Sequence, residues 1–291
     1  MKGMKTAIWL LAFGSMAVLA AGAGAAKDPI RLLLLDGQNN HDWKATTPVL
    51  RDMLLASGRF SVDILTAPPK DAPREAWGSF RPDFSKYKVV LSNYNGQLWP
   101  AECQAAFEKY MREGGGLVIY HAANNAFLEW SEWARMVGLL WAPATYGDRV
   151  TVDREGKVIR TPKGEGPGAG HGPQHAYEVI LRDIKHPIMR GLPLKWVHAK
   201  DELYHGQRGP AQNIHVLLTA FSSPTQKGTS TNEPMVFIVP YGKGRVFVNL
   251  LGHDQVSVAH SGCSALMVRG AEWAATGKVT IPAPRIHLNK K

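Results

Sequence analysis

The 291-residue chain contains only two cysteines, Cys103 and Cys263. Two thiols cannot build a disulfide framework or a four-cysteine metal site. Both lie on the apolar side of predicted helices, so we expect buried free thiols rather than a disulfide between them. Neither follows a strand at a tight turn, which argues against thiol catalysis.

The sequence also lacks a Gly-x-Ser-x-Gly motif and any run of five like charges. The first absence argues against a serine hydrolase of the α/β type. The second matters because the net charge is +10, and nucleic-acid-binding proteins usually concentrate their basic residues on one face. We therefore predict no nucleic-acid partner.

No long hydrophobic run is present either. The apolar part of the N-terminal segment, residues 6–21, is shorter than the about 20 residues that a membrane crossing requires. Lys2 and Lys5 precede it and small residues follow at 22–26, which is typical of a cleaved signal peptide. We expect residues 1–26 to be a signal peptide, the protein to be exported to the periplasm or beyond, and the mature form to have no membrane contact.

The remaining residues, 27–291, are enough for one large domain, and no linker divides them. Residues 31–36 form a continuous apolar run, typical of a strand that is covered on both faces. Further strands are predicted at 60–65, 88–92, 117–120, 177–181, 197–204, 215–220, 234–239 and 245–250, and helices at about 47–57, 100–113, 127–140 and 264–276. This alternation predicts an α/β fold with a doubly wound, mostly parallel sheet of flavodoxin-like type and extra C-terminal strands.

Regular patterning fails between residues 141 and 174, where a glycine-rich stretch runs from 164 to 173. We interpret it as a flexible surface loop. His171 and His175 have a spacing seen in zinc sites, but they lie in or beside this loop and not on a clear helix, so they predict a metal site only weakly.

Ligands of parallel α/β sheets bind outside the carboxyl ends of the strands. The loops at those ends, 37–43, 93–97 and 121–124, are rich in amides and imidazoles, which suits a polyhydroxylated ligand. Trp43 and Trp99 could offer flat apolar faces to a sugar ring. Turn formation and core packing are the structural alternatives for these residue types. The predicted substrate-binding residues are Asn40, His41, Asp42, Trp43, Asn95, Asn124, Tyr204 and Asp254.

His121 stands at the elbow that follows the glycine-flanked strand 117–120, where α/β enzymes often carry a reactive side chain. We predict His121, His253 and Glu202 as acid–base catalysts, because imidazoles beside a carboxylate are suited to proton transfer. We predict no resident cofactor. Convergence of these three with His41 would leave a divalent metal open, whereas His186 and His215 are interpreted as structural.

Seven motifs occur in one order along nearly the whole mature chain, at residues 37–48, 114–123, 186–188, 201–204, 241–246, 251–254 and 269–274. This series resembles the ThuA-like (trehalose utilisation) family. The resemblance implies a single ThuA-like domain over residues 27–291, with a class I glutamine amidotransferase-like fold that lacks the amidotransferase cysteine. It also implies a role in the metabolism of trehalose and other disaccharides, often alongside dehydrogenases that make 3-keto-sugars.

These observations lead to an exported enzyme that acts on a sugar or 3-keto-sugar by proton transfer, as an isomerase or lyase and not as a glutamine amidotransferase. Its expected partner is a small carbohydrate, and a homo-oligomer is left open. Two alternatives remain at this point: a carbohydrate-binding accessory protein without catalysis, and a metal-dependent glycoside hydrolase.

Overall fold

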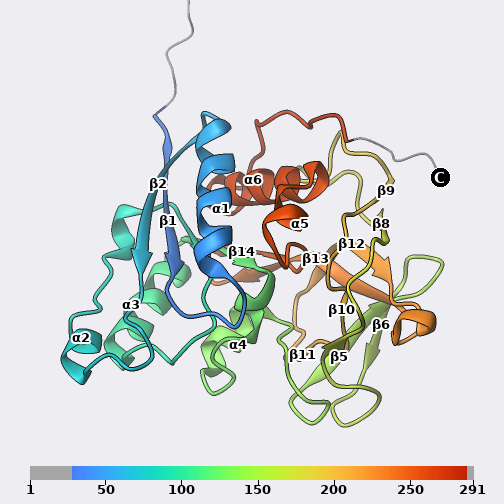
Figure 1. Ribbon diagram of the computed structural model, residues 1–291, viewed down its shortest axis with the longest axis horizontal. Coiled ribbons are helices and arrows are strands. Elements are labelled where there is room, and N and C mark those ends of the chain that lie inside the picture. Colours follow the sequence, from blue (N-terminus) through green and yellow to red (C-terminus); the bar gives the residue numbers. More distant parts are fainter. Residues whose placement is uncertain (1–27, 287–291) are drawn as a thin grey trace, which may run out of the picture.

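A computed structural model describes residues 28–286, and the predicted signal peptide lies outside the described residues (Figure 1). The main sheet has twelve strands. Along its path these are β2 (Phe60–Thr66), β1 (Ile30–Asp36), β3 (Val89–Ser92), β4 (Gly116–Tyr120), β14 (Gly244–Asn249), β13 (Asn232–Tyr241), β12 (His215–Phe221), β8 (Glu178–Leu181) and β9 (Lys195–Val197). Beside this path lie β5 (Asp148–Val152), β6 (Val158–Thr161) and β11 (Arg208–Gly209), while β7 (Gly170–His171) and β10 (Tyr204–His205) form a separate pair.

Strand direction divides the sheet into two parts. Strands β2, β1, β3, β4 and β14 pair in parallel, whereas β14, β13, β12, β8 and β9 pair in antiparallel fashion. We call residues 28–137 and 242–286 the parallel half, and residues 138–241 the antiparallel half. The predicted α/β class is confirmed, but the sheet is mixed rather than mostly parallel.

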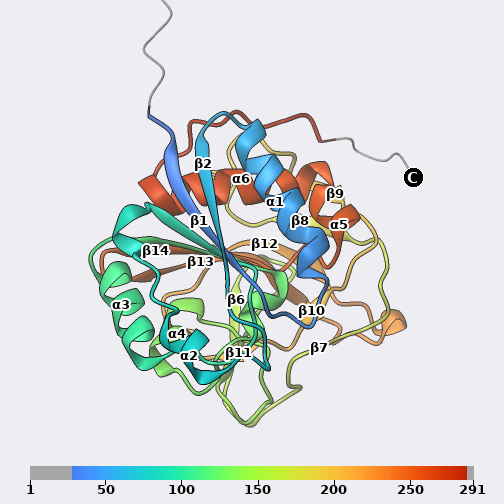
Figure 2. The same cartoon turned by 60° about the vertical axis from the view of Figure 1, so that its left-hand side comes forward.

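Helices cover both faces of the parallel half (Figure 2). One face carries α1 (Trp43–Ala56), α5 (Gln255–Ala259) and α6 (Ser261–Thr276), and the other carries α3 (Ala101–Arg112) and α4 (Ser131–Val137). The short α2 (Arg74–Gly78) and the 3-10 turns η1 (Phe84–Lys86), η2 (His121–Asn125) and η3 (Pro224–Gln226) lie in connections. Among the helices of residues 28–286, none combines the length and the apolar character that a bilayer crossing requires.

Apolar side chains fill the parallel half. Leu32 and Leu34 of β1 are fully buried, as the continuous apolar run predicts for a strand with helices on both sides. Cys103 on α3 and Cys263 on α6 are free and buried, as expected. Trp99 is also buried, within an aromatic cluster around Phe107, so the prediction that it offers a face to a sugar is wrong.

The antiparallel half has apolar core residues too, such as Leu218 and Val236, and it also encloses a buried ion pair. Arg149 of β5 bonds to Glu233 of β13, and Thr229 and Thr231 also donate to the same carboxylate oxygen. A buried ion pair is unfavourable unless additional hydrogen bonds of this kind compensate for the lost water.

The interpretation of residues 141–174 as a flexible surface loop is wrong. Strands β5 and β6 extend the sheet there, and β7 pairs with β10. The fully buried Arg208 fastens the glycine-rich stretch by donating to the Pro167 carbonyl at 2.9 Å. These short strands lack long apolar runs, so their pairing partners are set by tertiary contacts.

Other element boundaries also differ from the predictions. Helix α1 begins at Trp43, four residues before Thr47, because the Asp42 carboxylate accepts from the Ala45 amide at 3.1 Å and caps the helix there. The predicted strand 197–204 is two short strands with a connection between them, β9 and β10. The predicted helix 127–140 shortens to α4.

Candidate active site

Three histidines follow the carboxyl ends of parallel strands. His41 lies in the loop after β1, His121 comes directly after β4, and His253 lies in the loop after β14. Because these strands are parallel and belong to one sheet, their carboxyl ends meet at one edge. The loop after β1 needs Gly37, since its φ is +122° and an added Cβ would lie 2.6 Å from the Ala67 carbonyl oxygen.

Glu202, between β9 and β10, brings its carboxylate to the same edge. Its Oε2 lies 3.2 Å from Nδ1 of His253, 3.4 Å from Nε2 of His41 and 3.6 Å from Nε2 of His121. One ligand atom from each of the four residues lies within 4.8 Å of the others. The three predicted catalytic side chains therefore do converge, together with the predicted binder His41.

Hydrogen bonds on the side away from Glu202 orient two of the imidazole rings. Nδ1 of His121 lies 2.7 Å from the Leu250 carbonyl oxygen, and Nδ1 of His41 lies 3.1 Å from Oδ1 of Asn40. Because a carbonyl oxygen only accepts, each Nδ1 carries a hydrogen, and the neutral ring then has its Nε2 available to bind a metal ion. Metal-binding histidines are commonly held in this way.

The backbone at the elbow is strained. His121 has a φ of 43°, a left-handed value that is uncommon for a residue with a side chain, and only 2% of it is exposed. Gly252, beside it, has a φ of +106°, and an added Cβ would lie 2.7 Å from the Tyr120 ring. The predicted sharp turn is thus confirmed, and strain of this kind clusters at functional sites.

The surrounding histidines keep the carboxyl group of Glu202 ionised. Burial alone would raise the pKa of Glu202, but interactions with His121, His253 and His41 outweigh it and hold this pKa well below the ordinary value. Interaction with Glu202 raises the pKa of His253, whereas burial lowers the pKa of His41. His121 Nε2 and His253 Nδ1 are buried and have no aligned hydrogen-bond partner.

A cleft of about 430 Å³ opens onto the cluster. His171 of β7 reaches it, with Nε2 3.5 Å from Oε1 of Glu202. The Trp141 and Tyr204 rings pack against each other at 4.6 Å in the cleft wall. Sequence reasoning missed three of the lining residues, Asn125, Trp141 and His171. The nine lining residues are Asn40, His41, Asp42, Asn125, Trp141, His171, Glu202, Tyr204 and His253.

Comparisons with known proteins give the family. A family model described as ThuA, trehalose utilisation, matches residues 31–274. The chain belongs to the ThuA family. A ThuA-like protein from Parabacteroides merdae is 44% identical, with 88% of this chain and 94% of that chain covered and a TM-score of 0.83. One from Bacteroides uniformis is 20% identical over 89% and 96%, with a TM-score of 0.58, which shows the fold alone. No curated protein matches.

In this ThuA-family chain, four of the predicted substrate-binding residues line the cleft: Asn40, His41, Asp42 and Tyr204. Asn95 lies behind the cleft wall and bonds to Asn40. Three others do not line the cleft. Asn124 is buried and bonds to Gln207, Asp254 caps α5, and Trp43 on α1 lies under the Lys44 ammonium.

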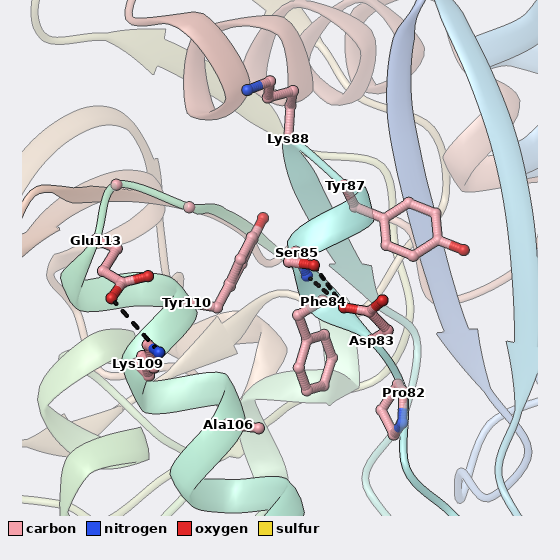
Figure 3. A pocket seen from close by; sticks show the side chains of 12 residues that line it. Pro82, Asp83, Phe84, Ser85, Tyr87, Lys88, Ala106, Lys109, Tyr110 and Glu113 are labelled. Carbon is pink, nitrogen blue, oxygen red and sulfur yellow. Dashed lines mark hydrogen bonds and ion pairs between the residues drawn. The ribbon is translucent and has the colours of Figure 1, made fainter.

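A larger cavity, of about 500 Å³, lies at the opposite edge of the sheet (Figure 3). Its wall includes Lys88, which precedes β3, and Gly114, which precedes β4, so it opens at the amino ends of these strands. No histidine lines it. Figure 3 shows the Tyr110 ring between Lys109 and Phe84 in this wall. Ligands of parallel sheets settle at the carboxyl edge, so the smaller cleft is the candidate active site.

Proposed function

We propose that this ThuA-family protein is an enzyme acting on a carbohydrate, and that His41, His121, Glu202 and His253 hold a divalent cation in its active site. The observation that carries the proposal is the convergence of three imidazole nitrogens and a carboxylate oxygen within 4.8 Å. Imidazole nitrogen and carboxylate oxygen are ligands that divalent ions such as Zn²⁺, Mn²⁺ and Co²⁺ accept, and with four protein ligands a five- or six-coordinate ion would keep a position for substrate. The cleft in front of the cluster offers that position.

The distances between Glu202 and the histidines favour a bound cation over a chain of direct hydrogen bonds that passes protons between the imidazoles. Good hydrogen bonds between nitrogen and oxygen measure about 2.7–3.2 Å and are aligned. Here the separations are 3.2–3.6 Å, and His121 Nε2 and His253 Nδ1 have no aligned partner. Lone pairs that point at a common centre, with their ring N–H groups fixed from behind, are the arrangement a metal ion needs.

The reaction we propose is proton transfer on a sugar or 3-keto-sugar, as isomerisation or elimination. A divalent cation supplies Lewis acidity toward a sugar oxygen. His171 lies on the open side of Glu202 with 36% of its side chain exposed, so it is placed to exchange a proton with the sugar. Trp141 and Tyr204 offer ring surface, and Asn40 and Asn125 offer amide groups for hydroxyls.

Three further points belong to this proposal. The family description, trehalose utilisation, supports a carbohydrate substrate. We infer export through residues 1–26, with action in the periplasm or beyond. We also infer that the order β2, β1, β3, β4 and β14 is the flavodoxin-like order of class I glutamine amidotransferase-like proteins.

The experiment measures metal content and turnover in the same preparation. Purified protein is assayed on glucosides and on their 3-keto forms, before and after chelation and again with Zn²⁺, Mn²⁺ or Co²⁺ added. We expect chelation to abolish turnover and a divalent cation to restore it. The His121→Ala variant should be inactive. His215→Ala is the control, because this exposed histidine pairs with Asp183 away from the cleft.

Two outcomes would contradict the proposal. A metal-free preparation with full turnover would exclude the cation. Calorimetric binding of unmodified sugars, with no product by mass spectrometry under any metal condition, would instead support a carbohydrate-binding protein without catalysis.

A further inference from the structure

Glu202 and His253 lie in two loop segments that no strand pairing joins. Glu202 lies between β9 and β10, and His253 lies between β14 and α5, each outside any helix or strand. No strand pairing therefore fixes the 3.2 Å between their side chains. Another group has to hold the two segments together.

Asp201 is in contact with both segments. Its Oδ1 accepts from the backbone N–H of Glu202 at 2.8 Å and of His253 at 2.9 Å. Its Oδ2 accepts from the Gly252 N–H at 2.7 Å and from Nε2 of His198 at 2.8 Å. The Asp201 carboxylate thus accepts backbone hydrogen bonds from two of the four proposed ligands, Glu202 and His253, and from Gly252.

We propose that Asp201 is a positioning residue of the active site, which sets the separation of Glu202 and His253, with His198 holding it in place from behind. It does not line the cleft, and it bonds to two of the four proposed ligands through their backbone N–H groups, so it acts through the backbone. This inference deepens the proposed function and rests on it for the presence of the cation. The hydrogen bonds of Asp201 are observed independently of the cation.

Asp201 is buried directly behind the site. Its side chain and that of His198 are both 0% exposed. A buried carboxylate is unfavourable unless hydrogen bonds compensate for the lost water. The four hydrogen bonds that Asp201 accepts supply this compensation, and two of them come from the backbone of proposed ligands.

Glu272 provides a matched control in the same protein. Its side chain, on α6, is also 0% exposed. It accepts from Nε of Arg59, from the N–H of Thr280 and from the N–H of Ile281. Glu272 therefore fastens the C-terminal segment with bonds like those of Asp201, but it has no contact with the cleft. Loss of either carboxylate should destabilise the fold, and only loss of Asp201 should alter the site.

The test compares Asp201→Asn with Glu272→Gln. An asparagine amide cannot accept on its nitrogen, so the two N–H groups that bond to one of the carboxylate oxygens lose their acceptor. We expect Asp201→Asn to weaken Co²⁺ binding by about 10–100-fold, the usual effect of losing a residue behind the ligands. Its Co²⁺ visible absorption bands should also shift. Glu272→Gln should lower Tm while Co²⁺ affinity and spectrum stay unchanged.

His198→Phe carries the test if Asp201→Asn does not fold. It deletes one of the four donors, and we expect Co²⁺ binding to weaken by about tenfold, the lower end of the same range. Unchanged Co²⁺ affinity and spectrum in folded Asp201→Asn or His198→Phe would overturn the inference.

The inference and the proposed cation fail in different ways. If the wild-type protein binds no Co²⁺, the cation proposal is wrong, and imidazole NMR signals of the metal-free protein then decide the positioning role. The His253 signals should shift in these variants, while those of the remote His186 stay in place. Unshifted His253 signals would again overturn the inference.

Discussion

The two halves of the sheet contribute to the cleft in different ways. The parallel half supplies His41, His121 and His253, each just beyond the carboxyl end of a strand. The antiparallel half supplies Glu202 and His171 from short, irregular segments. Strand ends meet in any parallel sheet, whereas the carboxylate arrives only through contacts particular to this chain. The site is therefore complete only when both halves are in place.

The interiors of the two halves also differ. Leu34 of β1 lies between β2 and β3 among apolar side chains. The antiparallel half encloses the Arg149–Glu233 pair together with two threonine hydroxyls. Apolar burial thus stabilises both halves, and the antiparallel half depends in addition on a hydrogen-bonded ion pair. The following predictions test this contrast, from the largest expected effect to the smallest.

The change Glu233→Ala should destabilise the protein most. It leaves the Arg149 guanidinium buried, with 7% of its side chain exposed, and without its anion. We expect a loss of about 3–5 kcal/mol in the free energy of unfolding, measured by urea denaturation. A loss below about 1 kcal/mol would show that this pair does not support the antiparallel half.

The change Leu34→Ala probes the parallel half. Leu34 is fully buried, so truncation removes apolar contact and leaves a cavity. We expect a loss of about 2–5 kcal/mol in the same urea experiment. Val158→Ala on β6 is the control, because Val158 is 48% exposed and should change stability by less than about 0.5 kcal/mol. Equal losses at both positions would contradict the assignment of the core.

The change Glu202→Gln tests the contribution of the antiparallel half to the cation. Replacing the anionic oxygen should weaken Zn²⁺ binding by at least about 100-fold, the upper end of the effect of losing an outer residue. Competition with a chromophoric chelator measures the affinity. Glu178→Gln is the control, since Glu178 is an exposed carboxylate of β8 that pairs with Lys195. Wild-type affinity in Glu202→Gln would remove Glu202 from the ligand set.

The change His171→Ala should have the smallest effect on metal binding. His171 contacts Glu202 through Oε1, the oxygen that faces away from the other histidines, so metal affinity should not change. We expect kcat to fall, because His171 is proposed to exchange a proton with the sugar. KM for the sugar should rise by about tenfold through the loss of one hydrogen bond, which corresponds to about 1.4 kcal/mol. Steady-state kinetics measure KM and kcat separately. A loss of bound metal would make His171 a ligand instead.

Much of the parallel half could be predicted from local patterns. The apolar run at 31–36 and the glycines before 117–120 predict β1 and β4 closely, and Gly277 ends the last helix as expected. The start of α1 was missed because Asp42 and Thr47 are both good caps, and only the three-dimensional structure shows which one accepts a hydrogen bond. Strands β5 to β7 were missed because they are short and their partners lie far away in the sequence.

The site was predicted only in part, for a related reason. His121, Glu202 and His253 stand out by residue type and by position after strands, and the structure brings them together. His171 lies in a glycine-rich stretch with no pattern of its own, and Asp201 gives no local sign that it accepts four bonds. Trp99 misled because a tryptophan fits a core as well as a cleft, and the half-buried Trp43 packs under its neighbour Lys44.

The sequence by itself determined the α/β class, the family and the edge of the sheet where the chemistry gathers, because strand ends follow from local apolar runs. Only the tertiary structure decided that three imidazoles face one carboxylate, and that Asp201 joins the segments bearing Glu202 and His253. Contacts between segments so far apart have no local signature, since they form only once the sheet has brought the loops together.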